Sequence, residues 1–142
     1  MSTRPKPSVN RLVETAIYVD DIASTGDFYD TVFGFPALVR DDRVVAYDAG
    51  ASSVFLLFKR GGTLKEVVLA GGTIPPHDGA GPSHFCFAID AEQLDDWEAH
   101  LAALNIPVEA RMNWDQGGKS LYFRDPDGHL IELGTPGIWR TY

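Results

Sequence analysis

The chain of 142 residues contains a single cysteine, few basic residues and no long apolar run. Cys86 alone cannot form an internal disulfide, which favours a reducing compartment and predicts a cytoplasmic protein. Twelve basic residues stand against 20 acidic ones, for a net charge of −8. This balance argues against binding to nucleic acid or docking on an anionic membrane, because both need basic patches. It permits attraction of cationic small molecules.

No apolar stretch approaches the roughly 20 residues of a membrane span. The opening MSTRPKPSVN also lacks the apolar core of a signal peptide, so we expect residues 1–9 to form a flexible leader. The hydrophobic content of 44% fits a globular protein that buries most of its apolar surface. We therefore expect residues 10–140 to form a single domain.

What the chain does contain is an internal repeat, seen in VETAIYVDD (13–21) and SHFCFAIDA (83–91). Both segments alternate apolar residues as strands do and end in Asp, and each is followed by a helical pattern and three strand candidates. Between the two halves, residues 61–82 are rich in Gly and Pro and read as a linker.

The order β-α-β-β-β, linker, β-α-β-β-β predicts an α+β fold of two paired modules, residues 10–60 and 83–140. Each module exposes one sheet face that its helix does not cover, and we expect the two open faces to form a cleft-bearing, incomplete sheet barrel. Ser24 is the predicted N-cap of the first helix and Gly34 its stop. Asp90 and Gln93 have the spacing of a capping box at the second helix.

Strand periodicity assigns Glu14, His84 and Glu132 to the less apolar faces of their strands. Glu14 and His84 occupy equivalent positions of the two repeats. His129 has the opposite parity to Glu132 and borders the Asp-Pro-Asp-Gly turn, so we predict a structural or surface role for it.

Two carboxylates and an imidazole in one cleft would bind a divalent metal such as Mn²⁺, Fe²⁺, Zn²⁺, Ni²⁺ or Co²⁺. Three protein ligands would leave positions open for water or substrate. The alternative from the residues alone is that Glu132 pairs with an arginine and His84 is hydrogen-bonded in the core or cleft. The available arginines are Arg111, Arg124 and Arg140.

Three stretches resemble the vicinal oxygen chelate superfamily, which includes glyoxalase I, fosfomycin-resistance thiol transferases, extradiol dioxygenases and bleomycin-binding proteins. They are VETAIYVDDIASTGDFYDTVFGF, SHFCFAID and LYFRDPDGHLIELGTPGIW, and with the paired-module plan the resemblance covers residues 10–140. It implies the paired-module fold, and it is weakly specific for any reaction within the superfamily.

The resemblance implies that the metal ligands fall on Glu14, His84 and Glu132. Superfamily members usually carry His or Gln at the position of Glu14, so this carboxylate is a departure from the pattern; it is expected to ligate the metal or to act as a catalytic base. Some glyoxalase-like members take a fourth ligand from the last strand of the first module, but the corresponding SSVFLLFK contains no carboxylate.

The general layout is most similar to the fosfomycin-resistance type, in which a metal and basic residues hold a phosphonate. The resemblance places matching positions at Lys119, Ser120 and Tyr122, with Arg124 or Arg140 as extra cations. For each cation, the simpler interpretation is a solvated turn residue or a surface ion pair.

Three functions remain open. The first is a metal-dependent lyase, transferase or dioxygenase that acts on a small oxygen-rich molecule. The second is a non-catalytic protein that binds a flat cationic antibiotic. The net charge suits it, and so do the aromatic residues Tyr18, Trp97, Trp114, Tyr122 and Trp139, of which Trp97 is expected in the core. The third is a degenerate, purely structural module. In the first two cases Tyr18, Trp114 and Tyr122 are expected to line the ligand site. The resemblance also implies a homodimer.

Overall fold

The computed structural model describes residues 4–142 and contains two α-helices, one short 3₁₀ helix and ten strands among them. The first module contains β1 (Glu14–Val19), α1 (Ile22–Val32), β2 (Ala37–Arg40), β3 (Val44–Asp48) and β4 (Val54–Lys59). A hairpin follows, made of β5 (Val67–Leu69) and β6 (Gly72–Ile74). The second module contains β7 (His84–Ala88), the 3₁₀ helix η1 (Ala91–Gln93), α2 (Leu94–Ala103), β8 (Ala110–Asn113), β9 (Lys119–Arg124) and β10 (Leu130–Gly134).

Each module folds into a four-stranded sheet with the same topology. The strand orders are β1-β4-β3-β2 and β7-β10-β9-β8, and in each sheet the first strand of the module pairs in parallel with the last. This confirms the α+β class and the repeated βαβββ plan. The two sheets are separate within the described chain and do not close into a barrel.

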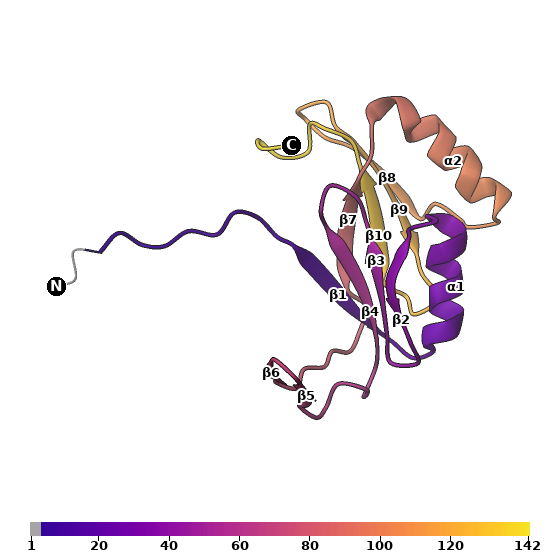
Figure 1. Cartoon of the computed structure of the whole chain (residues 1–142). Helices are drawn as coiled ribbons and strands as arrows, with labels where there is room; N and C mark the ends of the chain where they lie inside the picture. The colour runs from indigo at the N-terminus through magenta and orange to yellow at the C-terminus, as the bar shows by residue number, and fades with distance from the viewer. Residues whose placement is uncertain (1–3) are drawn as a thin grey trace.

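The two modules share one hydrophobic core. Both sheets turn one apolar face toward it, and α1 and α2 lie on the same side of the strands (Figure 1). Phe33, at the end of α1, joins the modules because its ring lies 5.0 Å from that of Phe87 and 5.5 Å from that of Trp97. The other face of each sheet is left uncovered by the helices. The fully buried core residues include Val19, Tyr29, Phe55, Leu57, Leu101, Phe123, Ile131 and Leu133.

The predicted helix ends are partly right. Gly34 follows α1 with φ +64°, as a helix stop requires, and its N–H bonds to the carbonyl of Asp30 at 3.0 Å. The N-cap of α1 is Asp21 and not Ser24, because the Asp21 carboxylate accepts from the backbone N–H groups of Ala23 and Ser24. Asp90 precedes η1 and makes no side-chain capping bond.

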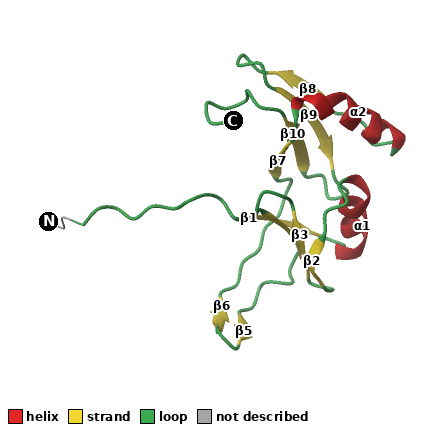
Figure 2. Cartoon of the chain, turned by 45° about the horizontal axis from the view of Figure 1, so that its top comes forward, coloured by secondary structure: helices red, strands yellow, loops and turns green. Residues whose placement is uncertain are grey.

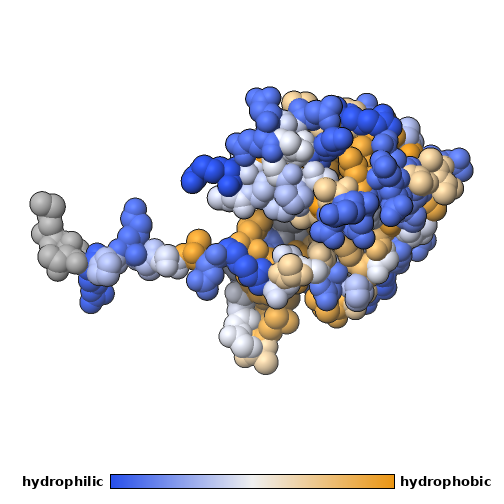
Figure 3. All heavy atoms as spheres, turned by 90° about the horizontal axis from the view of Figure 1, so that it is seen from above, coloured by the Kyte–Doolittle hydropathy of each residue, from blue (hydrophilic) through white to orange (hydrophobic). Residues whose placement is uncertain are grey.

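Two segments extend from the body of the molecule. The arm of residues 4–13 runs outward before β1 (Figures 1 and 3), and the β5–β6 hairpin projects from the segment that was predicted to be a plain linker (Figure 2). Among residues 4–142, no helix has the length and apolarity needed to cross a membrane.

Candidate functional site

His84 and Glu132 meet on the open face of the second sheet. They lie on neighbouring strands, β7 and β10, where Leu130 pairs with His84 and Glu132 with Cys86. The Nε2 atom of His84 lies 3.1 Å from Oε1 of Glu132. The imidazole is half exposed, whereas the carboxylate is only 8% exposed. The predicted pairing of these two residues is therefore present in the fold.

The proton position on His84 follows from its second nitrogen. Nδ1 lies 3.0 Å from the carbonyl oxygen of Leu130. Because a carbonyl oxygen only accepts, Nδ1 carries a proton and donates it there. In the neutral ring Nε2 then presents its lone pair to the Glu132 carboxylate. Two acceptors at 3.1 Å repel each other unless a proton or a metal ion is shared between them, so this pair is a candidate cation site.

Glu132 is oriented by two side chains of the second module. Ser120, which is buried, donates its hydroxyl to Oε2 of Glu132 at 2.5 Å. Trp114 in turn donates its indole N–H to the Ser120 oxygen at 2.9 Å. This chain of donors fixes the carboxylate and leaves Oε1 directed at His84. Metal-binding carboxylates are commonly held by hydrogen bonds of this kind.

A pocket of about 410 Å³ lies over this pair. Burial and the nearby charge of Glu132 raise the pKa of the Cys86 thiol to about 12, so this thiol is neutral and is not an activated nucleophile. The same two causes, burial first, raise the pKa of Tyr122. Both groups therefore keep their protons at neutral pH. The pocket is lined by His84, Cys86, Ala88, Trp114, Tyr122, Glu132, Ile138, Trp139 and Tyr142.

Glu14 lies apart from the His84–Glu132 pair in the single chain. Nε2 of His129, at the start of β10, bonds to the Tyr18 carbonyl at 2.9 Å, so the Tyr18 end of β1 lies beside the start of β10. Glu14 is four residues away along the extended strand, about 13 Å. It lines a different pocket, of about 520 Å³, with Phe33 and Trp97. Within residues 4–142, no three His, Cys, Asp or Glu side chains converge to hold a metal.

Only some of the other predicted substrate residues line the pocket over His84 and Glu132. Trp114 and Tyr122 line the pocket, and Ser120 lies beneath it as a support for Glu132. Lys119 is exposed and does not line the pocket, and its backbone N–H bonds to Thr135. Arg124 is held by the Glu109 carboxylate at 3.0 Å, the surface ion pair that the simpler interpretation expected.

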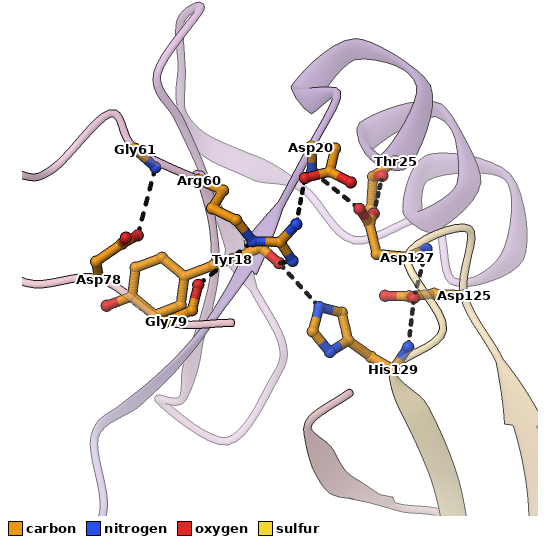
Figure 4. Close-up of polar contacts among 10 residues, drawn as sticks. All are labelled: Tyr18, Asp20, Thr25, Arg60, Gly61, Asp78, Gly79, Asp125, Asp127 and His129. Carbon is orange, nitrogen blue, oxygen red and sulfur yellow. Dashed lines mark hydrogen bonds and ion pairs between the residues drawn. The ribbon is translucent and has the colours of Figure 1, made fainter. Parts of the chain in front are cut away.

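Tyr18 is engaged by the linker between the modules. Its hydroxyl lies 2.5 Å from Nδ1 of His77, and Gly79 approaches so closely that a Cβ there would fall 2.5 Å from the Tyr18 ring. Figure 4 shows Gly79 beside this ring. In the single chain Tyr18 thus anchors the linker against the first sheet.

His129 has the structural role that strand parity predicted. It is buried, and its Nδ1 accepts from the Ser83 backbone N–H at 2.8 Å while Nε2 donates to the Tyr18 carbonyl. Asp127 of the same turn accepts from Thr25 at 2.6 Å and from the backbone N–H of Asp20 at 2.8 Å (Figure 4). The Asp-Pro-Asp-Gly-His turn therefore fastens the second module to the first.

The family model of the Glyoxalase/Bleomycin resistance protein/Dioxygenase superfamily matches residues 11–133. The chain belongs to this superfamily. The resemblance seen in the sequence is confirmed, and the match spans both modules and all three predicted metal ligands.

Individual superfamily members support the same assignment. The metallothiol transferase FosB of Bacillus licheniformis is 30% identical over 122 residues, which is 85% of this chain and 72% of that protein. The fosfomycin resistance protein FosX of Listeria innocua is 35% identical over 52 residues, 36% of this chain and 39% of that protein. The crystal structure of lactoylglutathione lyase from Agrobacterium tumefaciens has a TM-score of 0.83 and 34% identity, covering 95% of this chain and 99% of that one.

Sequence reasoning missed part of the site of this superfamily member. Ile138 and Tyr142 line the pocket from the C-terminal segment, which has no regular secondary structure and therefore no periodicity to mark it. His77 was also missed, because the Gly- and Pro-rich composition around it indicates only a linker. The short spacing of Trp139 and Tyr142, both aromatic, is the one local signal that could have pointed to this wall of the pocket.

Proposed function

We propose that this chain is a divalent-metal-dependent enzyme acting on a small oxygen-rich molecule, with the metal held by His84 and Glu132. The proposal rests on one observation, the 3.1 Å approach of an imidazole nitrogen to a buried carboxylate oxygen. A nitrogen and an oxygen donor this close could serve as two ligands of one divalent ion.

A divalent ion bound here would supply Lewis-acid polarisation of a substrate oxygen. The residues around the two proposed ligands fix their orientation. Leu130 fixes the His84 ring through Nδ1, and Ser120 with Trp114 fixes the Glu132 carboxylate. Such preorganised ligands lose little freedom when the ion and substrate bind. Nitrogen and oxygen donors of this kind suit Zn²⁺, Mn²⁺, Ni²⁺, Fe²⁺ or Co²⁺.

We propose Glu14 of a second copy as the third ligand, or as the catalytic base if it does not ligate. Glu14 is exposed and lies on the open face of the first sheet, as His84 does on the second. If the open faces of two copies meet, the first sheet of one copy lies over the second sheet of the other. It then brings its Glu14 to the His84–Glu132 pair of that other copy. Two-fold dimers are the commonest assembly and would form two such sites. The proposed place of action is the cytoplasm, where Cys86 stays reduced.

The layout is that of a transferase or lyase rather than a dioxygenase. The metallothiol transferase relative and the lactoylglutathione lyase structure both favour these classes. A dioxygenase site of this superfamily would use two His and one Glu. The proposed set here contains one His and two Glu.

Metal binding by the purified protein tests the proposal. We expect Mn²⁺, Zn²⁺ or Ni²⁺ to bind at about one ion per chain, measured by calorimetry after chelator treatment. His84→Ala and Glu132→Gln are expected to weaken binding at least about tenfold. The matched control is His100→Ala, since His100 lies on α2 and its Nε2 bonds to the Val32 carbonyl at the end of α1, away from the site. A wild-type protein that binds none of these ions would end the proposal, and unchanged binding in both site variants would end the assignment of ligands.

A second candidate is a non-catalytic binding protein for a flat cationic molecule. The aromatic wall of the pocket, with Trp114, Tyr122 and Trp139, and the net charge of −8 favour it. It predicts that a flat cation binds equally well to the metal-free protein and to His84→Ala. The metal measurement above separates it from the enzyme.

A further inference from the structure

We infer that the chain has a second binding site, in the cavity at the junction of its two modules, and that this site takes a small primary amine with an apolar tail. The cavity is distinct from the pocket over His84 and Glu132. The inference holds whether or not that pair binds a metal.

The junction cavity has a volume of about 520 Å³ and is lined by both modules. The start of β1 and the end of β7 form part of its wall, through residues 12–15 and 86–89. These two strands belong to different sheets of the described chain, so no strand pairing closes the junction between them. Small-molecule sites usually have volumes of roughly 300–1,000 Å³ and often lie where two folding units meet. The junction cavity therefore has the size and the position of a small-molecule site.

Aromatic side chains form much of the wall of this cavity. The ring of Phe33 lies 5.0 Å from the rings of Phe35 and Phe87. Trp97 lies 5.5 Å from Phe33. All four side chains line the cavity and are only half-buried, so packing within the chain leaves part of each ring exposed. An apolar tail bound here would remove this surface from water, which favours binding.

Glu14 is the one charged residue among those that line the cavity. It is exposed, which places its carboxylate at the cavity mouth, and among residues 4–142 it forms no hydrogen bond or ion pair. Thr15 and Ser53 add two hydroxyl groups to the lining. A protonated amine donates three hydrogen bonds and carries the charge opposite to that of a carboxylate, so these groups suit its head. An anionic head would meet Glu14 and no Lys or Arg of the lining.

The junction cavity and the pocket over the second sheet can be told apart by their residues. Cys86 and Ala88 line both, whereas His84 and Glu132 line only the pocket. An amine in the junction cavity should therefore bind without the His84 ring. Because Glu14 is also the proposed third metal ligand of a neighbouring copy, metal is removed before the amine is measured. A protein that binds no metal and still binds the amine would refute the proposed enzyme and keep this inference.

Three ligands with one tail test the head group: 4-phenylbutylamine, 4-phenylbutanol and 4-phenylbutyrate. Their affinities are measured by calorimetry at pH 7 on the chelator-treated full chain. We expect the amine to bind at least about tenfold more tightly than the carboxylate and about threefold more tightly than the alcohol. Glu14→Gln is expected to make the amine and the alcohol bind alike, because it removes the charge and keeps the shape of the side chain.

Thr15→Phe tests the place of binding, because Thr15 is exposed and its replacement by a larger ring narrows the cavity. We expect this variant to weaken the amine and the alcohol at least about fivefold. The matched control is Thr73→Phe, since Thr73 is an exposed strand residue on the β5–β6 hairpin and does not line the cavity. His84→Ala is expected to leave all three affinities unchanged.

Four results would overturn the inference. They are a carboxylate that binds as tightly as the amine, amine binding that is unchanged in both Glu14→Gln and Thr15→Phe, and amine binding that is lost in His84→Ala. The fourth is the absence of binding by all three ligands, as expected if residues 4–13 or a second copy of the chain fill the cavity in solution.

Discussion

His84 and His129 lie beside the same pair of strands, β7 and β10, and differ in the face they occupy. His129 is buried and bonds to the Ser83 N–H and the Tyr18 carbonyl, so His129→Ala removes a buried ring together with two hydrogen bonds to half-buried backbone groups. We expect it to lower the free energy of unfolding by about 2–4 kcal/mol. His84 is half exposed, and His84→Ala should change this free energy by less than about 0.5 kcal/mol.

Metal affinity should fall in His84→Ala and stay unchanged in His129→Ala, because only His84 faces Glu132. Urea unfolding and calorimetric Mn²⁺ titration of the two variants, both at a temperature where each is folded, measure the two effects. A folded His129→Ala protein that has lost metal affinity as fully as His84→Ala would contradict this division of roles.

Strand parity could separate these histidines from the sequence because alternation is a local property of the backbone. The side chain of each successive residue points to the opposite face whatever the rest of the chain does. What parity cannot supply is the partner across the sheet. The support of Glu132 by Ser120 and Trp114 depends on the β9–β10 register and on a loop, and neither is encoded by alternation within one strand.

At the scale of elements, Tyr47 on β3 holds α1 against the first sheet. Its hydroxyl lies 3.0 Å from the Gly26 carbonyl and 2.9 Å from Asp30 Oδ1. Burial, and then the hydrogen bond and charge of Asp30, raise the pKa of Tyr47 from 10.0 to about 12. Because the folded state favours the protonated phenol, this contribution to stability is complete below pH 10. It is lost as the pH rises from 10 to about 12.

Tyr47→Phe is therefore expected to lower the free energy of unfolding by about 1–2 kcal/mol at pH 8. The difference from wild type should shrink as the pH rises above 10. Urea unfolding of both proteins between pH 8 and 11 measures it, and the remaining tyrosines affect both proteins alike. A difference that stays constant over this range would show that Tyr47 does not titrate as the structure indicates.

The elements themselves were largely predictable, since each strand and helix has its own periodicity. The exceptions have physical causes. Asp21 outcompetes Ser24 as the N-cap because its charged carboxylate, three residues earlier, accepts two backbone N–H bonds. The β5–β6 hairpin was missed because its strands are three residues long and lie in Gly- and Pro-rich sequence. Composition of that kind predicts turns well and short strands poorly.

At the scale of the whole molecule, the sequence identified the candidate ligands but not how the modules place them. Within each sheet the last three strands pair with their neighbours in sequence, whereas the packing of one module on the other depends on contacts such as Phe33 with Phe87 and Asp127 with Thr25. In one chain Glu14 and His84 line different pockets, although Cys86 and Ala88 line both. The grouping of Glu14 with His84 and Glu132 stays a prediction, and it now requires two chains.

Mixed dimers test this requirement directly. A Glu14→Ala chain and a His84→Ala chain each lack one ligand, so dimers of either alone should bind Mn²⁺ at least about tenfold more weakly than wild type. In a mixed dimer, one site receives Glu14 from the first-module sheet of the His84→Ala chain. It receives His84 and Glu132 from the other chain, and is complete. Co-expression with two different tags and tandem purification isolates this species, and we expect one tight Mn²⁺ site per dimer.

The matched control mixes a His84→Ala chain with a Glu132→Ala chain. Each site of this dimer lacks one ligand, so tight Mn²⁺ binding should not be restored. Recovery in the control, or none in the Glu14→Ala mixture, would place the third ligand elsewhere.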